Sequence, residues 1–172
     1  MERDNSILAV VVFLALVLIL VFAIAISGNN TFQNGQISFE YPNGWAQDHV
    51  TGNFSAQSLY SEVTLKKNVQ NSNGTEITAY IILQMQQKAI GSFSLPNTST
   101  IVMNTTNSTT VSVGVANLTA IQLANFGNNV AHKTTIIDKN NYYFTLEYIT
   151  PPFAVNQTED AYNMILQTLK IG

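Results

Sequence analysis

Few residues of this chain have the chemistry to act as catalysts or metal ligands. Its two histidines are His49 and His132, and it has no cysteine, which excludes thiol chemistry and cysteine-metal sites. A zinc site takes three or four ligands. His49 and the neighbouring Asp48 supply two of them, and His132 adds a third only if the fold brings it close. We expect instead that both histidines lie at the surface, in polar loops or at strand ends, so the sequence predicts no metal or cofactor site.

The other reactive side chains have a structural interpretation. The sequence holds no Gly-x-Ser-x-Gly motif and no evident Ser/His/acid arrangement. The adjacent carboxylates Glu159 and Asp160 suit the first turn of a helix, whose N-terminal end favours negative charge. Lys66 and Lys67 suit a solvated strand end rather than an anion site. We therefore expect a protein that is not an enzyme and has no catalytic residue.

The most prominent feature of the sequence is an uncharged, apolar run from Ile7 to Ile26, which lacks Gly and Pro. Sixteen of its twenty residues are Leu, Ile, Val or Phe. At about 1.5 Å per residue, a helix of this length spans roughly 30 Å, the thickness of the bilayer's hydrocarbon core. The run therefore predicts a single transmembrane helix, with the lipid bilayer as its partner.

Two other interpretations of the apolar run stay open. Ala23-Ile24-Ala25 is similar to a signal peptidase site, but the run is longer than a typical signal peptide core and lacks a basic flank. A pilin-type core helix would need a processing site before the run, and residues 1–6 show no convincing one.

Arg3 is the sole basic residue before the run, which places the N-terminus in the cytoplasm and the C-terminal domain outside the cell membrane.

Sequons for N-glycosylation are abundant after the apolar run. Such sites are used on exported surfaces, so their number supports the same orientation. The expected glycosylation sites are those in polar, loop-like sequence, together with one at the start of the last helix: Asn73, Asn97, Asn104, Asn107 and Asn156.

The composition of the part after the run restricts its partners. It carries six Lys, no Arg and eight acidic residues. Nucleic-acid binding needs a basic patch that neutralises phosphates, and none is present. We therefore expect no nucleic-acid partner, and an unknown protein at the cell surface as the partner instead.

Alternating apolar residues predict a mainly antiparallel sheet of five to eight strands. Asn34-Gly35 between two such segments is a strong hairpin signal, with Ile37, Phe39 and Tyr41 on one face. Residues 62–67 form a short strand, and residues 76–87 a central strand with apolar residues on both faces, covered on both sides. Residues 130–138 and 141–150 form a second hairpin. Its aromatic residues are expected in the core and in cross-strand pairs rather than in a sugar-binding platform: Tyr142, Tyr143, Phe144 and Tyr148.

The last element is an amphipathic helix. Tyr162, Ile165, Leu166 and Leu169 have the spacing of one helical stripe, which should pack on the sheet. Asn156 is the predicted N-cap, with Glu159 three residues further on.

Three segments together resemble the PsbP and PsbP-like domains and their small membrane-anchored relatives in archaea and bacteria. These segments are NGQISFEYPNGW at 34–45, the hairpin at 134–150 and the helix end at 165–171. The resemblance implies an α+β fold, an antiparallel sheet flanked by helices in an α/β/α sandwich, and a non-enzymatic exported module. The chain departs from the pattern at 96–110, an Asn/Thr-rich stretch where the family often has a helix.

The domain organisation predicted is a cytoplasmic N-terminus (1–6), a transmembrane anchor (7–26), a linker (27–30) and an extracytoplasmic PsbP-like domain (31–172). The predicted function is that of a cell-surface module that binds a partner or supports an envelope complex. The alternatives are an extracytoplasmic ligand-binding domain or enzyme whose site is assembled by the fold, and a pilin-like filament subunit.

Overall fold

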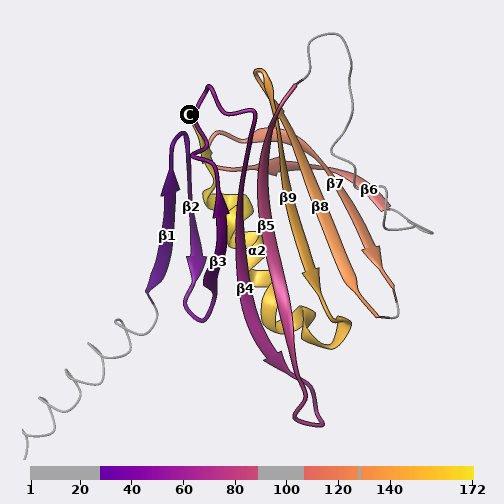
Figure 1. Cartoon of the computed structure of the whole chain (residues 1–172). Helices are drawn as coiled ribbons and strands as arrows, with labels where there is room; N and C mark the ends of the chain where they lie inside the picture. The colour runs from indigo at the N-terminus through magenta and orange to yellow at the C-terminus, as the bar shows by residue number, and fades with distance from the viewer. Residues whose placement is uncertain (1–27, 89–106, 128) are drawn as a thin grey trace, which may run out of the picture.

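The structure is a computed structural model that describes residues 28–88, 107–127 and 129–172. It is mostly antiparallel β-sheet, in two sheets, with one helix near the C-terminus, an α+β arrangement (Figure 1). The larger sheet has seven strands in the order β3 (Ala46–Thr51), β4 (Tyr60–Gln70), β5 (Glu76–Gln87), β9 (Tyr142–Thr150), β8 (Ala131–Lys139), β7 (Leu118–Phe126) and β6 (Asn107–Val113). The smaller sheet has the order β1 (Asn29–Asn34), β2 (Ile37–Pro42) and β10 (Lys170–Ile171).

The prediction of one sheet is wrong, because the first hairpin leaves the main sheet. A tight turn after Pro42 separates β2 from β3, and the Trp45 amide donates to the Pro42 carbonyl. β2 then pairs with the end of the chain instead of with β3, through Ser38 to Lys170 and Ile37 to Ile171. The short strand β10 was not predicted, since two residues are too few to show a periodicity.

The first hairpin itself is confirmed. Asn34 and Ile37 are cross-strand partners on either side of the turn, and Gly35 has a positive φ of 56°. The predicted inward residues of β2 are all buried, as is Trp45: Ile37, Phe39 and Tyr41.

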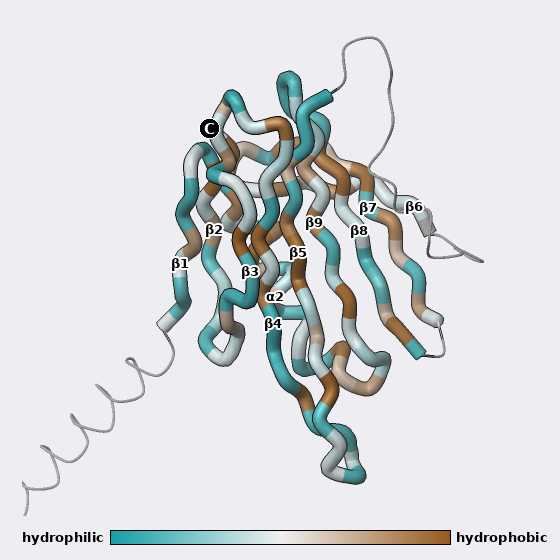
Figure 2. Tube along the Cα trace, in the orientation of Figure 1, coloured by the Kyte–Doolittle hydropathy of each residue, from teal (hydrophilic) through white to brown (hydrophobic). Residues whose placement is uncertain are grey.

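One hydrophobic core joins the two sheets and the helix. Its members on the large sheet come from alternate positions of β4, β5 and β9, such as Leu65, Ile81 and Leu146, each 1% exposed or less. Figure 2 shows the hydrophobic and hydrophilic residues alternating along these strands. We call the face that they occupy the inner face, and the opposite one the outer face. The predicted aromatic cluster of β9 is confirmed as buried: Tyr142, Tyr143, Phe144 and Tyr148.

The central strand β5 has the predicted bounds, 76–87, and lies between β4 and β9. The prediction that both of its faces are covered is wrong. Ala79, Ile81 and Leu83 on the inner face are buried, whereas Tyr80 and Ile82 on the outer face stay partly exposed. The apolar residues on both faces therefore reflect a strand with one core face and one half-exposed apolar face.

Helix α2 (Val155–Thr168) follows the short 3-10 helix η1 (Pro152–Ala154) and covers the inner face, where it packs on β2 and β9. Figure 1 shows it behind β4 and β5. The predicted stripe is confirmed by the burial of Tyr162, Ile165, Leu166 and Leu169.

The predicted start of this helix is wrong. Ala154 is the N-cap and no side chain caps the helix, so Asn156 is its second residue and the first turn holds no acid. The reason is that η1 leads directly into the helix, with the Ala154 amide donating to the Pro151 carbonyl. Thr158 anchors this end instead, because its hydroxyl donates to the Ala154 carbonyl and lies 2.7 Å from the Tyr148 hydroxyl.

Within the described ranges, no helix is long and apolar enough to cross a membrane. The predicted anchor, 7–26, and the predicted N-terminus, 1–6, lie outside those ranges. β1 begins at Asn29, so the strand starts inside the predicted linker of 27–30.

Loss of stability at high pH is expected from Tyr162, which is fully buried. Burial raises the pKa of Tyr162 to about 12, although hydrogen bonds with Thr135 and Gln122 act in the opposite direction. The neutral phenol therefore stabilises the folded chain fully below the unfolded pKa of 10.0, and this contribution is lost as the pH rises to about 12. Urea unfolding across this range should show a smaller alkaline loss for Tyr162→Phe than for wild type. An equal loss for Tyr162→Phe and for the half-exposed control Tyr80→Phe would contradict the prediction.

Candidate functional site

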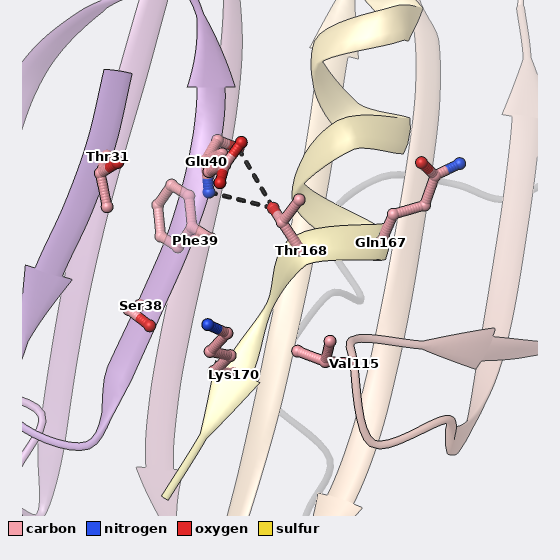
Figure 3. Close-up of a pocket in the computed structure, with 8 residues that line it drawn as sticks. All are labelled: Thr31, Ser38, Phe39, Glu40, Val115, Gln167, Thr168 and Lys170. Atoms are coloured by element: carbon pink, nitrogen blue, oxygen red, sulfur yellow. Dashed lines mark hydrogen bonds between the residues drawn. The ribbon is translucent and has the colours of Figure 1, made fainter. Parts of the chain in front are cut away.

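A shallow groove lies where the small sheet meets the end of helix α2 (Figure 3). Its volume is about 240 Å³, smaller than most small-molecule sites, which run to about 300–1,000 Å³. The groove is lined by Thr31, Ser38, Phe39, Glu40, Val115, Gln167, Thr168 and Lys170.

Two polar residues of this groove, Glu40 and Thr168, help to hold the fold together. The Glu40 amide donates to Thr168 Oγ1 at 3.0 Å, just beyond the point where β10 stops pairing with β2 (Figure 3). The Glu40 carboxylate accepts from Asn29 Nδ2 at 3.1 Å. Thr168 thus replaces the missing strand partner of β2, and the groove is a structural junction rather than the better candidate for a site.

The outer face of the large sheet carries a polar cluster at its centre. Strand alternation sets its members on this face, because core residues such as Val63, Leu83 and Leu146 alternate with them on β4, β5 and β9. His132 and Thr134 of β8 share this face, because they lie opposite Ile149 and Glu147. Helix α2 packs on the inner side, behind the sheet in Figure 1. We define the outer-face cluster as Tyr60, Glu62, Gln84, His132, Thr134, Thr145 and Glu147.

One half of this cluster surrounds Glu62, whose carboxylate is fully hydrogen-bonded. Its carboxylate accepts hydrogen bonds from the Tyr60 hydroxyl, from Gln84 Nε2 at 2.9 Å and from Thr64 Oγ1 at 3.4 Å. Burial alone would raise the pKa of Glu62, but these hydrogen bonds outweigh it and hold the pKa below its ordinary value. Burial also raises the pKa of Tyr60, helped by its bond to Glu62 and by the nearby charge of Glu147. Glu62 is therefore a fixed negative charge.

The other half consists of Glu147 and His132, which have fewer hydrogen-bond partners. His132 Nε2 lies 3.2 Å from Thr134 Oγ1 and 3.6 Å from Glu147 Oε2. The second distance exceeds that of a normal hydrogen bond. The Glu147 side chain is 16% exposed and His132 4%. Among the described residues, the Glu147 carboxylate has no closer partner than this histidine.

Thr145 adds an unpaired hydroxyl between these two halves. Its side chain is 1% exposed, and its Oγ1 has no hydrogen-bond partner within the part of the chain that the structure describes. Gln84 on β5 and Ile136 on β8 are its direct cross-strand partners, so their side chains flank it on the outer face. A buried hydroxyl without a partner costs about 1–3 kcal/mol, which makes it an exception in a folded protein.

The structure separates the residues that were considered as metal ligands, His49, Asp48 and His132. β4, β5 and β9 lie between β3, which carries His49, and β8, which carries His132. At about 4.8 Å per strand spacing, the two are roughly 19 Å apart. Asp48 pairs with Lys66 Nζ at 2.5 Å, and His49 lies 2.6 Å from Thr51 Oγ1. In the described ranges, no group of acidic residues and histidines could hold a metal ion.

His49 is exposed on β3, in line with the predicted surface position. The same prediction is wrong for His132, which is buried. His132 lies on β8, between β9 and β7, with Thr134 within hydrogen-bond distance and Glu147 3.6 Å away, and the sequence alone did not show that β8 is an internal strand. Glu159, predicted for the first turn of the helix, instead forms an ion pair with Lys133 on β8.

The predicted glycosylation sites fall into three groups. Asn73 is exposed in the turn between β4 and β5, and Asn156 is exposed on α2. Asn97 and Asn104 lie outside the described residues. Asn107 is the first residue of β6, so its predicted position in a loop is wrong.

Sequence reasoning missed Glu62, Gln84, Thr145 and Glu147. The signal was present in β9, where Thr145 and Glu147 alternate with the core residues Phe144, Leu146 and Tyr148. Polar residues on one face of an internal strand need partners on the neighbouring strands, and the register was not available from the sequence.

Comparison with known proteins gives little further information. No protein-family model matches the chain, and no curated protein matches it. Among solved structures, the chain is similar to LpqN, described as involved in cell envelope biogenesis of Mycobacterium tuberculosis. The TM-score is 0.41 and the identity 16%, over 83% of this chain and 91% of that one. A likeness this distant supports no conclusion about function.

Proposed function

We propose that this protein is a cell-surface module, held to the membrane by residues 7–26, that binds a partner without covalent chemistry. The outer face of the large sheet is the proposed binding surface. The observation that carries this proposal is the unpaired, buried hydroxyl of Thr145 beside the weakly paired carboxylate of Glu147. Polar groups left without partners in the free protein are expected where a ligand supplies them.

The anchor is proposed from the sequence of 7–26 together with the position of β1. Since β1 begins at Asn29, Ser27 and Gly28 alone separate it from the end of the apolar run. Such a short connection would keep the domain close to the bilayer. We also propose that the domain is PsbP-like. The support for this assignment is the 34–45 segment, which forms the β1–β2 turn, β2 and Trp45.

Membrane attachment and orientation have a direct test. The full-length protein should stay in the membrane pellet after carbonate extraction, and protease added to intact cells should remove the domain. Full-length protein released by carbonate would contradict the anchor. A domain that resists protease on intact cells but is digested after lysis would contradict the orientation.

Partner binding is tested by pull-down of the protein and its partner from detergent-solubilised membranes. Wild type is compared with two variants that each carry one substitution on β5. Ile82→Glu places a charge at the centre of the outer face, whereas Ile77→Glu changes a residue that is 38% exposed near the β4–β5 turn. We expect the partner to be lost with Ile82→Glu and kept with Ile77→Glu. Equal recovery of the partner with both variants would show that the outer face is not the binding surface.

A further inference from the structure

Three side chains of the outer-face cluster, Gln84, Thr145 and Glu147, have groups that can still form hydrogen bonds with a ligand, and most of these groups are acceptors. Glu147 offers two carboxylate oxygens, and Gln84 offers its side-chain oxygen, because its Nε2 already donates to Glu62. Thr145 offers a hydroxyl. This group of three presents four acceptor oxygens, two from Glu147 and one each from Gln84 and Thr145, but only two remaining donors, the second N–H of Gln84 and the O–H of Thr145. The ligand it fits is therefore a hydrogen-bond donor.

The three side chains also converge. Gln84 and Thr145 face each other directly across β5 and β9, and Glu147 lies two residues from Thr145 on the same face of β9. Two residues along a strand span about 6.6 Å, so one small group can reach all three side chains. Gln84 and Ile136, which flank the buried Thr145 hydroxyl, are partly exposed, so a ligand would reach this hydroxyl by displacing the exposed ends of these two side chains.

The charge of the cluster selects among possible donors. Glu62 and Glu147 carry negative charge, while the two lysines on the outer face, Lys66 and Lys88, form ion pairs with Asp48 and Asp138. A neutral polyol would leave this charge uncompensated and would also need N–H donors from the protein. A primary ammonium group has three donors, no acceptor and one positive charge.

From this geometry we infer that Gln84, Thr145 and Glu147 bind a primary ammonium group at the end of an alkyl chain. The stem of such a ligand would lie against the half-exposed apolar side chains around the cluster, Ile82, Ile136 and Ile149. The inference rests on the proposed function, since it specifies what the outer face recognises. A lysine side chain of a partner and a free alkylamine present the same chemistry.

The test uses the purified full-length chain in detergent micelles, with the isoleucine δ1 methyl groups labelled for NMR. n-Butylammonium chloride is the probe. Tetramethylammonium has the same charge without N–H, and 1-butanol has the chain without the charge. We expect butylammonium to shift the methyl signals of Ile82 and Ile136, which directly face Glu147 and Thr145, and to leave Ile77 unchanged. Equal shifts from tetramethylammonium, or no shift at Ile82 and Ile136, would overturn the inference.

Matched variants identify the groups that hold the ammonium. Glu147→Gln should weaken butylammonium binding by about tenfold or more, since it removes a charge-assisted hydrogen bond. Glu76→Gln, at the exposed start of β5, should bind as wild type does. Wild-type affinity in Glu147→Gln would refute the site. The peptide acetyl-Gly-Lys-Gly-amide separates the two sources: shifts like those of butylammonium indicate a lysine of a partner, and shifts from butylammonium alone indicate a free amine.

Thr145→Val tests the site without destabilising the fold, so weaker binding by this variant cannot be explained by unfolding. It removes a buried hydroxyl that has no partner and keeps the shape of the side chain, so thermal unfolding should occur at the same or a higher temperature. The same variant should bind butylammonium several-fold more weakly than wild type. A folded Thr145→Val protein with unchanged affinity would contradict the role of this hydroxyl.

These measurements are independent of any partner. Equal recovery of the partner with Ile82→Glu and Ile77→Glu, together with intact butylammonium binding, would reject the proposed function and leave the ammonium site. Loss of the partner with Ile82→Glu alone, together with no butylammonium binding, would reject the ammonium site and leave the proposed function.

Discussion

Replacing Leu166 with alanine is expected to lower the free energy of unfolding by about 2–5 kcal/mol, as for other large truncations in a core. Leu166 is 9% exposed and belongs to the core cluster that joins helix α2 to both sheets. Its carbonyl also accepts the Gly114 amide at 2.6 Å, which ties the β6–β7 turn to the helix. Truncation would leave a cavity at the junction of these elements.

Urea unfolding of wild type, Leu166→Ala and Asn163→Ala measures this effect. Asn163 is exposed on the same helix, so its substitution should change stability by no more than about 0.5 kcal/mol. A midpoint for Leu166→Ala equal to that of the control would show that the helix is not docked on the sheet.

Replacing Gly35 with alanine is the second change with a large expected effect. Gly35 has φ +56°, where an L-residue costs about 1–2 kcal/mol. A Cβ here would also lie 2.2 Å from the Asn53 carbonyl oxygen and 2.5 Å from that of Phe54. Both contacts are with backbone, so the loop before β4 would have to move, and such overpacking costs about 1–3 kcal/mol more.

Gly44→Ala is the matched control for this clash. Gly44 also has a positive φ, +88°, but nothing lies within 4 Å of the position of its Cβ. We expect Gly44→Ala to lower stability by the backbone strain alone, about 1–2 kcal/mol, and Gly35→Ala to lower it clearly further. Thermal unfolding of the two variants side by side decides this, and equal losses would show that the close approach at Asn53 does not constrain the hairpin.

The parts of the fold that were predicted depend on local patterns. The Asn34-Gly35 turn, the bounds of β5 and the apolar stripe of α2 each come from a few neighbouring residues whose spacing has a single simple interpretation. The helix start was mispredicted because a good capping residue, Asn156, stood close to the true start. The backbone turn of η1 made that cap unnecessary.

The candidate site could not be predicted because it depends on register between distant strands. Glu62, Gln84 and Thr145 meet since β4 pairs with β5 and β5 with β9, and Gln84 is 61 positions before Thr145 in sequence. A shift of one residue in either pairing would move each polar side chain to the core. The sequence showed the alternation in each strand but not which strands are neighbours, and it gave no reason to single out a threonine without a partner.

The most direct test of the outer face as the binding surface is site-specific photo-crosslinking in the cells that produce the protein. A benzophenone amino acid replaces Ile82 on the outer face or, as control, the exposed Asn163 on α2, which lies on the opposite side of the sheet. Irradiation is expected to give a crosslinked product from position 82 and none from position 163. A product from position 163 without one from position 82 would contradict the account and place the partner on the helix side.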